Sequence, residues 1–288
     1  MGGMFGGGYA GPKEVHYMFI DGEQLRCTAE DVGKIWFGKP VEIDYQALQG
    51  ACQKVFYYDC LPAKAAGADD AEYQARYDAK LAFFNKLRAL PGWHVSEGLA
   101  RHRKRERQEQ KEVDILIAVD MLTHTHRKNM HRLTFVSGDQ DFAPLLEAVV
   151  RDGMYVELLY PAGRTGPDLM HFADVAKPMD VDFMHSMSTP TFRKENTIPD
   201  RCGESVNAPG DGILVSEGLL SGVPYAKVWR GASTGDFTVK TIQGDGLNQN
   251  TFWTVRHKDE ERAKRYFARW MERDYGISAK ALQWEERP

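Results

Sequence analysis

Short apolar runs alternate with longer stretches in which apolar residues recur every three or four positions along the first two thirds of the chain. The short runs are typical of buried β-strands, and the periodic stretches are typical of amphipathic helices. The strands predicted in this way are HYMFID at 16–21, KVFYYDC at 54–60, WHVSEG at 93–98, RLTFVSG at 132–138, MYVELLYP at 154–161 and the extended KPMDVD at 177–182.

Segments with the periodicity of amphipathic helices separate these strands. The predicted helices are AEYQARYDAKLAFFNKLRAL at 71–90, VDILIAVDMLTHTHRK at 113–128, DFAPLLEAVVRDG at 141–153 and PDLMHFADVA at 167–176. Strands that alternate with helices form βαβ units, in which successive strands lie parallel. The pattern therefore predicts an α/β domain with a mostly parallel central sheet at about residues 13–186.

The two ends of the chain differ from this domain. Residues 1–12 are glycine-rich, and we predict a flexible N-terminal segment there. GGGYAG at 6–11 has the spacing of a dinucleotide-binding loop, but no strand precedes it, so we reject that match. Residues 187–211 are rich in proline, glycine and polar residues and predict a linker. Strand-like runs and one clear helix then predict a small α+β module at 212–288.

Composition narrows the class of protein. Hydrophobic residues make up 42% of the 288 residues and charged residues 27%, as in an ordinary globular protein, and the net charge of -4 argues against bulk adhesion to nucleic acid or to an anionic membrane. The chain has no apolar run of membrane-spanning length and no signal-peptide pattern, so no membrane association is expected. The four cysteines form no C-x-x-C pair, so we expect reduced thiols and a cytoplasmic protein.

Four aspartates stand where a parallel sheet would bring them together. Asp21 ends the first predicted strand, Asp139 and Asp141 follow a later strand, and Asp114 opens a helix. Ligands of parallel α/β sheets bind at the carboxyl ends of the strands, so these four side chains are candidates for one site. Asp120 lies six positions after Asp114, which turns it about 120° away around a helix and makes it a weaker candidate.

A shared acidic site predicts a metal. Carboxylates a few ångströms apart repel one another unless a cation or protons neutralise them. A site of carboxylate oxygens suits Mg²⁺ or Mn²⁺ rather than zinc, and such metals promote the hydrolysis of phosphodiesters. Any single aspartate could instead cap a helix, but the four placements together favour a shared site. The histidines of THTHRKNMH at 123–131 lack a cysteine or an acidic ligand at helical spacing, so they favour a polar helix face over a zinc site.

One dense basic run, ARHRKRERQEQK at 100–111, leads directly to Asp114. A polyanionic substrate beside a metal site needs its phosphates neutralised, which favours nucleic-acid binding by this run. A solvated surface is the alternative. The candidate nucleic-acid-binding residues are Arg103, Lys104, Arg105 and Lys111.

Four segments carry a combined pattern: MFIDGEQL at 18–25, QKEVDILIAVDML at 110–122, LTFVSGDQDFAPLLEAVVRDGMYVELL at 133–159 and DLMHFADVAKPMD at 168–180. The third is the most specific, with an apolar strand, then S-G-D-x-D-F, a helix, a glycine and another strand. Together these segments resemble the NYN domain family, a branch of the PIN-like nuclease superfamily. The resemblance covers about residues 16–182, and we know no equivalent for the C-terminal hundred residues.

The resemblance implies a PIN-like, Rossmannoid three-layer fold and a metal-dependent ribonuclease. It implies that the catalytic and metal-binding residues are Asp21, Asp114, Asp139 and Asp141, and that the supporting positions are Gln24, Ser137 and Asp120. The sequence departs from the family pattern at two positions. Gln24 replaces a common asparagine, and Glu112 replaces a common glycine, which bears on substrate positioning more than on metal binding.

We therefore expect an endoribonuclease that cleaves RNA with Mg²⁺ or Mn²⁺. Two alternatives remain open, a catalytically weak NYN-type nucleic-acid-binding or regulatory module and a DNA-acting nuclease. A Toprim-like enzyme needs a glutamate where Asp21 ends the first strand, and a haloacid-type phosphatase needs a second aspartate where Glu23 stands, so both rank lower.

The C-terminal module mixes aromatic and basic residues on its predicted strands. They would suit contact with nucleic acid, and the module could also bind a protein partner or a second copy of the chain. An ordinary small core with a few surface cations is the alternative. The residues are Trp229, Arg230, Lys240, Phe252, Trp253, Arg256 and His257.

Overall fold

The structure is a computed structural model of the chain. It describes residues 14–64, 67, 69–98, 106–204, 212–242 and 252–287, and for residues 106–111 the backbone alone. The chain divides into two compact units, an N-terminal unit (Met1–Glu195) and a C-terminal unit (Asn196–Pro288). The predicted flexible segment at 1–12 lies outside the described residues.

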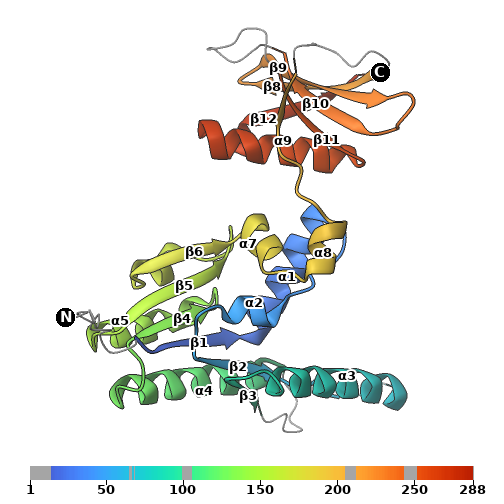
Figure 1. The fold of residues 1–288 in the computed structure, drawn as a ribbon. Helices are drawn as coiled ribbons and strands as arrows, with labels where there is room; N and C mark the ends of the chain where they lie inside the picture. Colours follow the sequence, from blue (N-terminus) through green and yellow to red (C-terminus); the bar gives the residue numbers. More distant parts are fainter. Residues whose placement is uncertain are drawn as a thin grey trace, which may run out of the picture. The chain divides into compact units, whose positions relative to one another are not determined.

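The N-terminal unit is built on a six-stranded parallel sheet with the order β3-β2-β1-β4-β5-β6 (Figure 1). The prediction of a mostly parallel central sheet is therefore confirmed. The strands are β1 (His16–Asp21), β2 (Lys54–Cys60), β3 (Trp93–Gly98), β4 (Arg132–Val136), β5 (Tyr155–Pro161) and β6 (Val175–Met179).

The chain reverses its direction across the sheet after β3. The strands β2 and β3 lie on one side of β1, and β4, β5 and β6 lie on the other. As a result β1 and β4 are neighbours, with Ile20 opposite Val136. In open parallel sheets, ligands bind at the carboxyl ends of the strands beside such a reversal. The topology therefore points to the ends of β1 and β4.

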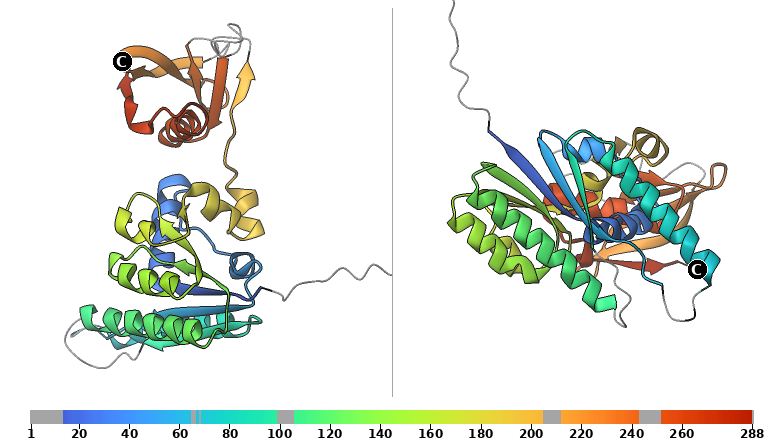
Figure 2. Two further views of the ribbon diagram at one scale, coloured as in Figure 1. Left: turned by 90° about the vertical axis from the view of Figure 1, so that its left-hand side faces the viewer. Right: turned by 90° about the horizontal axis from the view of Figure 1, so that it is seen from below.

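Helices cover both faces of the sheet and complete the predicted three-layer fold (Figure 2). On one face, α4 (Glu106–His126) and α5 (Ala143–Arg151) bury Ile117, Met121 and Leu146. On the other face, Tyr57 of β2 contacts Phe83 and Phe84 of α3 (Asp70–Arg88). The remaining helical segments are α1 (Gly22–Trp36), α2 (Tyr45–Gln49), η1 (Gln140–Phe142), α6 (Pro167–His171), α7 (Val181–Ser186) and α8 (Pro190–Glu195).

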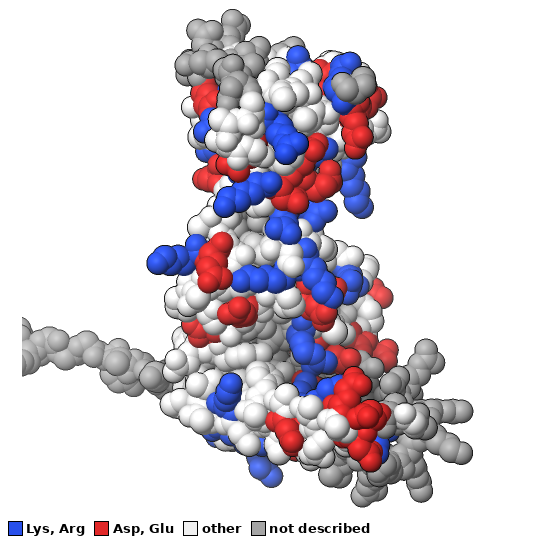
Figure 3. All heavy atoms as spheres, turned by 90° about the vertical axis from the view of Figure 1, so that its right-hand side faces the viewer, with Lys and Arg blue, Asp and Glu red and all other residues white. Residues whose placement is uncertain are grey.

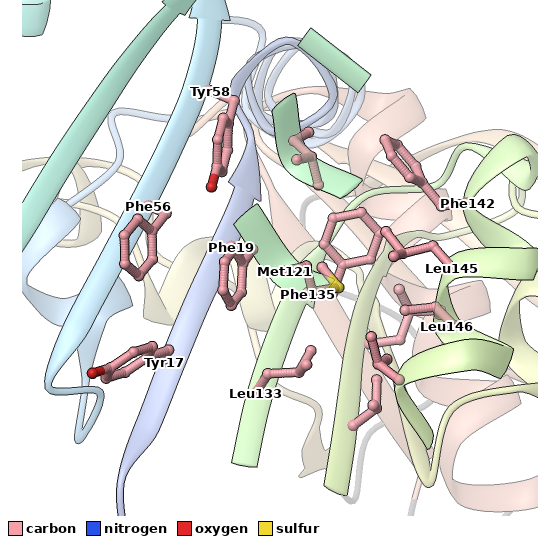
Figure 4. Close-up of a cluster of buried hydrophobic side chains, with 14 of the residues drawn as sticks. Tyr17, Phe19, Phe56, Tyr58, Met121, Leu133, Phe135, Phe142, Leu145 and Leu146 are labelled. Carbon is pink, nitrogen blue, oxygen red and sulfur yellow. The ribbon is translucent and has the colours of Figure 1, made fainter. Parts of the chain in front are cut away.

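Aromatic side chains fill the core between the sheet and the α4–α5 layer (Figure 4). Phe19 of β1 stacks on Phe56 of β2 with ring centroids 5.0 Å apart, and Phe135 of β4 meets Phe142 edge-on, also at 5.0 Å. Successive residues of a strand face opposite sides of a sheet. The residues of β1 on either side of Phe19 therefore face the other helix layer. The central strand is buried on both faces, which fixes the position of its carboxyl end.

Gly22 allows α1 to begin directly after β1. A Cβ atom at this position would lie 2.4 Å from the Tyr57 ring, so any side chain would push the helix off β2. The absence of a side chain at Gly22 therefore keeps the first turn of α1 against the end of the sheet.

The C-terminal unit contains a six-stranded antiparallel sheet with the order β12-β8-β9-β10-β11-β7. Helix α9 (Glu260–Tyr275) packs on β10 and β11 and buries Phe267 and Met271, as expected for an α+β module. No helix within the described ranges is long and apolar enough to span a bilayer. The other elements are β7 (Cys202–Glu204), β8 (Gly212–Leu220), β9 (Val223–Gly231), β10 (Phe237–Thr241), β11 (Phe252–His257), η2 (Ala279–Ala281) and β12 (Leu282–Glu286).

The segment 187–211, predicted as a linker, contains the helix α8 and the strand β7. Helix α8 belongs to the N-terminal unit, because Phe192 is fully buried and meets Phe37 edge-on at 5.3 Å. A β-bridge between Ile43 and Ser188 also fastens the chain just before this helix. One buried aromatic residue in a polar segment gives too weak a period to predict such a helix from the sequence.

Replacing Phe192 with alanine should destabilise the N-terminal unit by about 3–5 kcal/mol, because the change leaves a cavity where a fully buried ring had packed. Thermal or urea denaturation of the whole chain would measure this loss. Thr191→Ala is the matched control, since Thr191 is exposed on the same helix and should change stability little. Equal stability of the two variants would show that α8 does not contribute to the core.

Candidate active site

Asp21 is the last residue of β1 and the N-cap of α1. Its Oδ1 atom accepts a hydrogen bond from the Gln24 backbone N–H at 3.1 Å, and its Oδ2 atom accepts one from the Ser137 hydroxyl at 3.3 Å. The residue is only 6% exposed. Capping therefore occupies one oxygen of this carboxylate, while the other faces the end of β4.

Ser137 connects the ends of the two central strands. It directly follows β4, is fully buried, and donates to Asp21 while its oxygen accepts the Asp139 backbone N–H at 3.2 Å. Asp139 in turn caps η1, because its Oδ1 accepts the Asp141 backbone N–H at 3.0 Å. A single hydroxyl thus fixes the loop that carries Asp139 and Asp141 beside Asp21.

Asp114 reaches the same edge from the first half of α4. It is half-buried, and burial followed by the charges of Asp139 and Asp141 raises the pKa of its carboxyl to about 6. Burial is also the main reason that the pKa of Asp21 rises to about 7, and the charge of Asp114 adds to it. The charge of Asp114 thus acts on Asp21, and the charges of Asp139 and Asp141 act on Asp114, so we call these four side chains the acidic cluster.

A cavity of about 910 Å³ opens beside this cluster. Asp21, Glu23 and Asp114 line one part of it, and the exposed Glu23 raises the pKa of both Asp21 and Asp114 through its charge. The rest of the lining comes from β2, the segment after it and α3, with single residues of α1, α2 and α4. The volume falls within the ordinary range for a small-ligand site.

The supporting candidates separate in the structure. Ser137 lies within the cluster, and Gln24 contributes its backbone N–H. Asp120, six positions after Asp114 on α4, instead accepts a hydrogen bond from the Tyr58 hydroxyl at 2.9 Å. Its orientation agrees with the weaker rank expected from its spacing.

The basic run is the part of the prediction that the structure describes least. Arg103, Lys104 and Arg105 lie outside the described residues, and Lys111 falls on the part of α4 described by its backbone. On the face that Figure 3 shows, basic and acidic side chains are interspersed over the described surface. A role in substrate binding for these four residues therefore stays a prediction.

The histidines at 123–131 have separate partners. His124 packs on the rings of Tyr17 and Phe56, and the His131 ring accepts the Val15 backbone N–H at 3.0 Å. His126 pairs with Asp152 at 3.1 Å. Each of these three histidines therefore has its own packing, hydrogen-bond or ion-pair partner in the fold or at the surface.

Several aromatic and basic residues of the C-terminal unit serve that unit itself. Lys240 is 1% exposed and pairs with Glu204 at 2.6 Å, while the Arg201 guanidinium lies 4.0 Å from the centre of the Trp253 ring. Arg256 also pairs with Glu204. These contacts agree with an ordinary core more than with an open nucleic-acid surface.

The donor set of the acidic cluster fits a hard divalent cation. Its ligands are carboxylate oxygens, and burial and repulsion raise the pKa of two of them, which a cation would reverse. Among the described residues, no three acidic, histidine or cysteine side chains are arranged to hold one ion directly. Mg²⁺ commonly keeps several of its waters and is held through one or two carboxylates, so this arrangement suits binding that is partly water-mediated.

The sequence model of the NYN domain family matches residues 17–180, which is more than half of the chain. The chain belongs to the NYN domain family. Its N-terminal unit is thus a nuclease-like NYN domain, and the acidic cluster lies within the matched residues.

Solved structures add little to this assignment. The chain is similar to a crystal structure of a protein of unknown function from Vibrio parahaemolyticus, with 21% identity, a TM-score of 0.43, and coverage of 59% of this chain and 95% of that one. It is also similar to a presumed oxidoreductase from Parabacteroides merdae, with 13% identity, a TM-score of 0.24, and coverage of 74% of this chain and 44% of that one. Both TM-scores are too low to carry an argument. No curated protein matches the chain.

A second charged cluster lies in the cavity and was not predicted from the sequence. Asp59 lies next to the end of β2 and pairs with Arg26 of α1 and Lys80 of α3. The signal was available, because KVFYYDC was predicted as a strand and the same rule that selected Asp21 at a strand end selects Asp59. Arg26 and Lys80 gave no such signal, since only tertiary packing brings them together.

Asp21→Asn should stabilise the metal-free protein at pH 8 by about 2–4 kcal/mol. The folded-state pKa of Asp21, about 7, lies above its value in the unfolded chain, so the folded state favours the protonated form. Its contribution to stability is therefore full below about pH 4 and is lost as the pH rises to about 7. Denaturation in EDTA across pH 4–8 would measure the difference between wild type and variant.

Asp69→Asn is the matched control, because Asp69 also caps a helix but is exposed. Asp69→Asn should lack the gain in stability at pH 8 that is expected of Asp21→Asn. Mg²⁺ or Mn²⁺ should raise the melting temperature of the wild type and of Asp69→Asn at pH 8, and that of Asp21→Asn much less. Identical pH profiles for the two variants would contradict the raised pKa of Asp21.

Proposed function

We propose that the NYN domain is a metal-dependent endoribonuclease that hydrolyses RNA phosphodiesters with Mg²⁺ or Mn²⁺. The observation that carries this proposal is the coupled cluster of four aspartates at the reversal of strand order, within the residues that match a nuclease-like family. A shallow polar surface without such a cluster would favour a purely binding function instead.

The aspartates would hold the cation in the proposed reaction. The carboxylates of Asp21 and Asp139 are held in place by the hydrogen bonds with which they cap α1 and η1. The charge of Asp141, like that of Asp139, contributes to the raised pKa of Asp114. A divalent cation bound there would neutralise the cluster, polarise the phosphodiester and lower the pKa of the attacking water. Without it, four negative charges would repel a nucleic-acid backbone.

Ser137 is a positioning residue in this scheme. Its hydroxyl holds Asp21 and the Asp139 loop in a fixed relation, so neither carboxylate needs to reorganise as charge develops on the substrate.

Asp21→Asn and Asp139→Asn should each reduce RNA cleavage on the order of 100-fold or more, because each removes a ligand charge and misaligns the attacking water. A fluorescent single-stranded RNA incubated with the whole chain and Mn²⁺ or Mg²⁺ would report internal cuts. EDTA should stop the reaction. Asp69→Asn serves as the control, since it replaces a helix cap outside the cluster and should cut at the wild-type rate.

DNA of the same sequence separates the rival functions. Cutting of DNA without cutting of RNA would replace the ribonuclease proposal with a DNA-acting nuclease. Binding of nucleic acid by folded protein, with no cutting across several divalent metals and substrates, would replace it with a regulatory binding module.

The basic run is proposed to bind the RNA backbone. Changing Arg103, Lys104 and Arg105 together to alanine should weaken RNA binding and lower the slope of log affinity against log salt by roughly 0.7 for each phosphate that the run neutralises. Fluorescence anisotropy at salt concentrations from about 50 to about 300 mM would measure this slope. Arg127→Ala with Lys128→Ala is the control, because these exposed cations follow the opposite end of α4. An equal slope in all three proteins would assign the run to a solvated surface.

A further inference from the structure

Acids and cations both line the cavity beside the acidic cluster. The acids near that cluster are Asp21, Glu23 and Asp114, and Arg76 of α3 is one of the cations. Arg26 and Lys80, where α1 and α3 approach β2, form what we call the cationic end. A nucleic-acid strand presents a negative phosphate at every nucleotide. A cavity that combines an acidic metal site with nearby cations can therefore contact two successive phosphates in different ways.

Asp59 organises the cationic end. It is 5% exposed, and its Oδ2 atom accepts hydrogen bonds from Arg26 at 3.2 Å, Lys80 at 2.5 Å and the Tyr57 hydroxyl at 3.2 Å. Its Oδ1 atom accepts the Cys60 backbone N–H at 2.8 Å. One carboxylate thus serves two cations, and the exposed Glu23, which also lines the cavity, adds a weaker negative charge that acts on both.

These acids do not fully balance the charge of Lys80. The Lys80 side chain is 15% exposed, and burial followed by the charge of Arg26 lowers the pKa of Lys80 despite its contact with Asp59. Arg26 keeps half of its side chain exposed, so its guanidinium can bind a ligand while it remains paired with Asp59. A phosphate beside Arg26 and Lys80 would balance the second cation.

An aromatic wall adjoins these cations. Tyr45 of α2 and Phe83 of α3 both line the cavity, are half-buried, and contact each other with ring centroids 5.5 Å apart. Each ring also packs against Tyr57, at 6.4 Å for Tyr45 and 5.9 Å for Phe83, so a nucleobase would contact the part of each ring that lines the cavity. Cations and rings in one cavity together match the two parts of a nucleotide.

We infer that Arg26 and Lys80, held on the buried carboxylate of Asp59, form a phosphate-binding subsite for a nucleotide whose base packs on Tyr45 and Phe83. This inference rests on the proposed function, because the subsite would hold the nucleotide next to the phosphodiester at the aspartate cluster. The phosphate could be an internal one of the strand or a terminal one, and both offer the same anionic oxygens to the two cations.

A purely structural ion-pair network is the competing account of Asp59. In that account the two salt bridges only fasten α1 and α3 to β2, and no anion binds. The two accounts make different predictions for the effect of Asp59→Asn on phosphate binding. Loss of this carboxylate should weaken the fold in both, but it should strengthen phosphate binding only if Arg26 and Lys80 form an anion site.

Binding of adenosine 5′-monophosphate to the whole chain in EDTA tests the inference, because this readout needs neither metal nor cleavage. Arg26→Ala and Lys80→Met should each weaken binding roughly tenfold, the usual effect of losing one charge-assisted hydrogen bond. Asp59→Asn should strengthen binding severalfold. Lys34→Ala is the control, since Lys34 lies on the same helix α1, is exposed and pairs with Glu30, and it should bind as wild type does.

Circular dichroism and melting curves would establish that each variant is folded, and Arg26→Gln, which keeps a donor for Asp59, replaces Arg26→Ala if that variant unfolds. Unchanged affinity in folded Arg26 and Lys80 variants, or weaker binding in Asp59→Asn, would overturn the subsite. Trinucleotides with and without a 5′-phosphate separate the two sources. Loss of affinity for both in Arg26→Ala assigns an internal phosphate, and loss for the 5′-phosphorylated one alone assigns a terminal phosphate.

The outcomes for the subsite and for the ribonuclease are independent. A protein that binds the mononucleotide through Arg26 and Lys80 but never cuts RNA would refute the ribonuclease and retain the subsite. A protein that cuts RNA with the same KM in wild type and Arg26→Ala, and does not bind the mononucleotide, would refute the subsite alone.

Discussion

The carboxylate of Asp21 is buried at the end of the central strand, and the surrounding structure supplies the hydrogen-bond donors that make this burial possible. A buried carboxylate is costly unless donors surround it. Here the Gln24 N–H at the start of α1 and the Ser137 hydroxyl after β4 supply them. Gly22 allows the helix to start close enough to donate, and the pairing of β1 with β4 brings the serine within reach. The remaining pKa elevation shows that these donors offset the cost only in part.

Capping and site formation are compatible at this edge. Asp21 caps α1 and Asp139 caps η1, each through one oxygen, so the structural role of each aspartate fixes its side chain without using all of it. A side chain that already accepts a hydrogen bond from a backbone N–H of the following turn loses little further freedom when it binds a ligand. The caps therefore pre-organise the cluster for ligand binding.

The sequence was sufficient for the parallel sheet, because alternating strands and helices determine that topology. That Asp21, Asp114, Asp139 and Asp141 form one site stays a prediction, which is supported by the charges of Asp139 and Asp141 that raise the pKa of Asp114. The sequence was not sufficient for α8, whose anchor is one buried phenylalanine in a polar segment. It also missed the cationic end of the cavity. Arg26 and Lys80 lie 54 positions apart by number (80 minus 26) on two helices, and only the packing of both helices on β2 makes them neighbours of Asp59.

The hydrogen bond between Ser137 and Asp21 joins residues 116 positions apart. Contacts of such long range form late, because the intervening chain must first be ordered at an entropic cost. During synthesis Asp21 is made early, yet its partner leaves the ribosome only after β2, α3, β3 and α4 have been produced. A nascent chain consequently holds no assembled acidic centre until nearly half of the protein exists, so the proposed nuclease activity would arise only after the nascent domain has closed on itself.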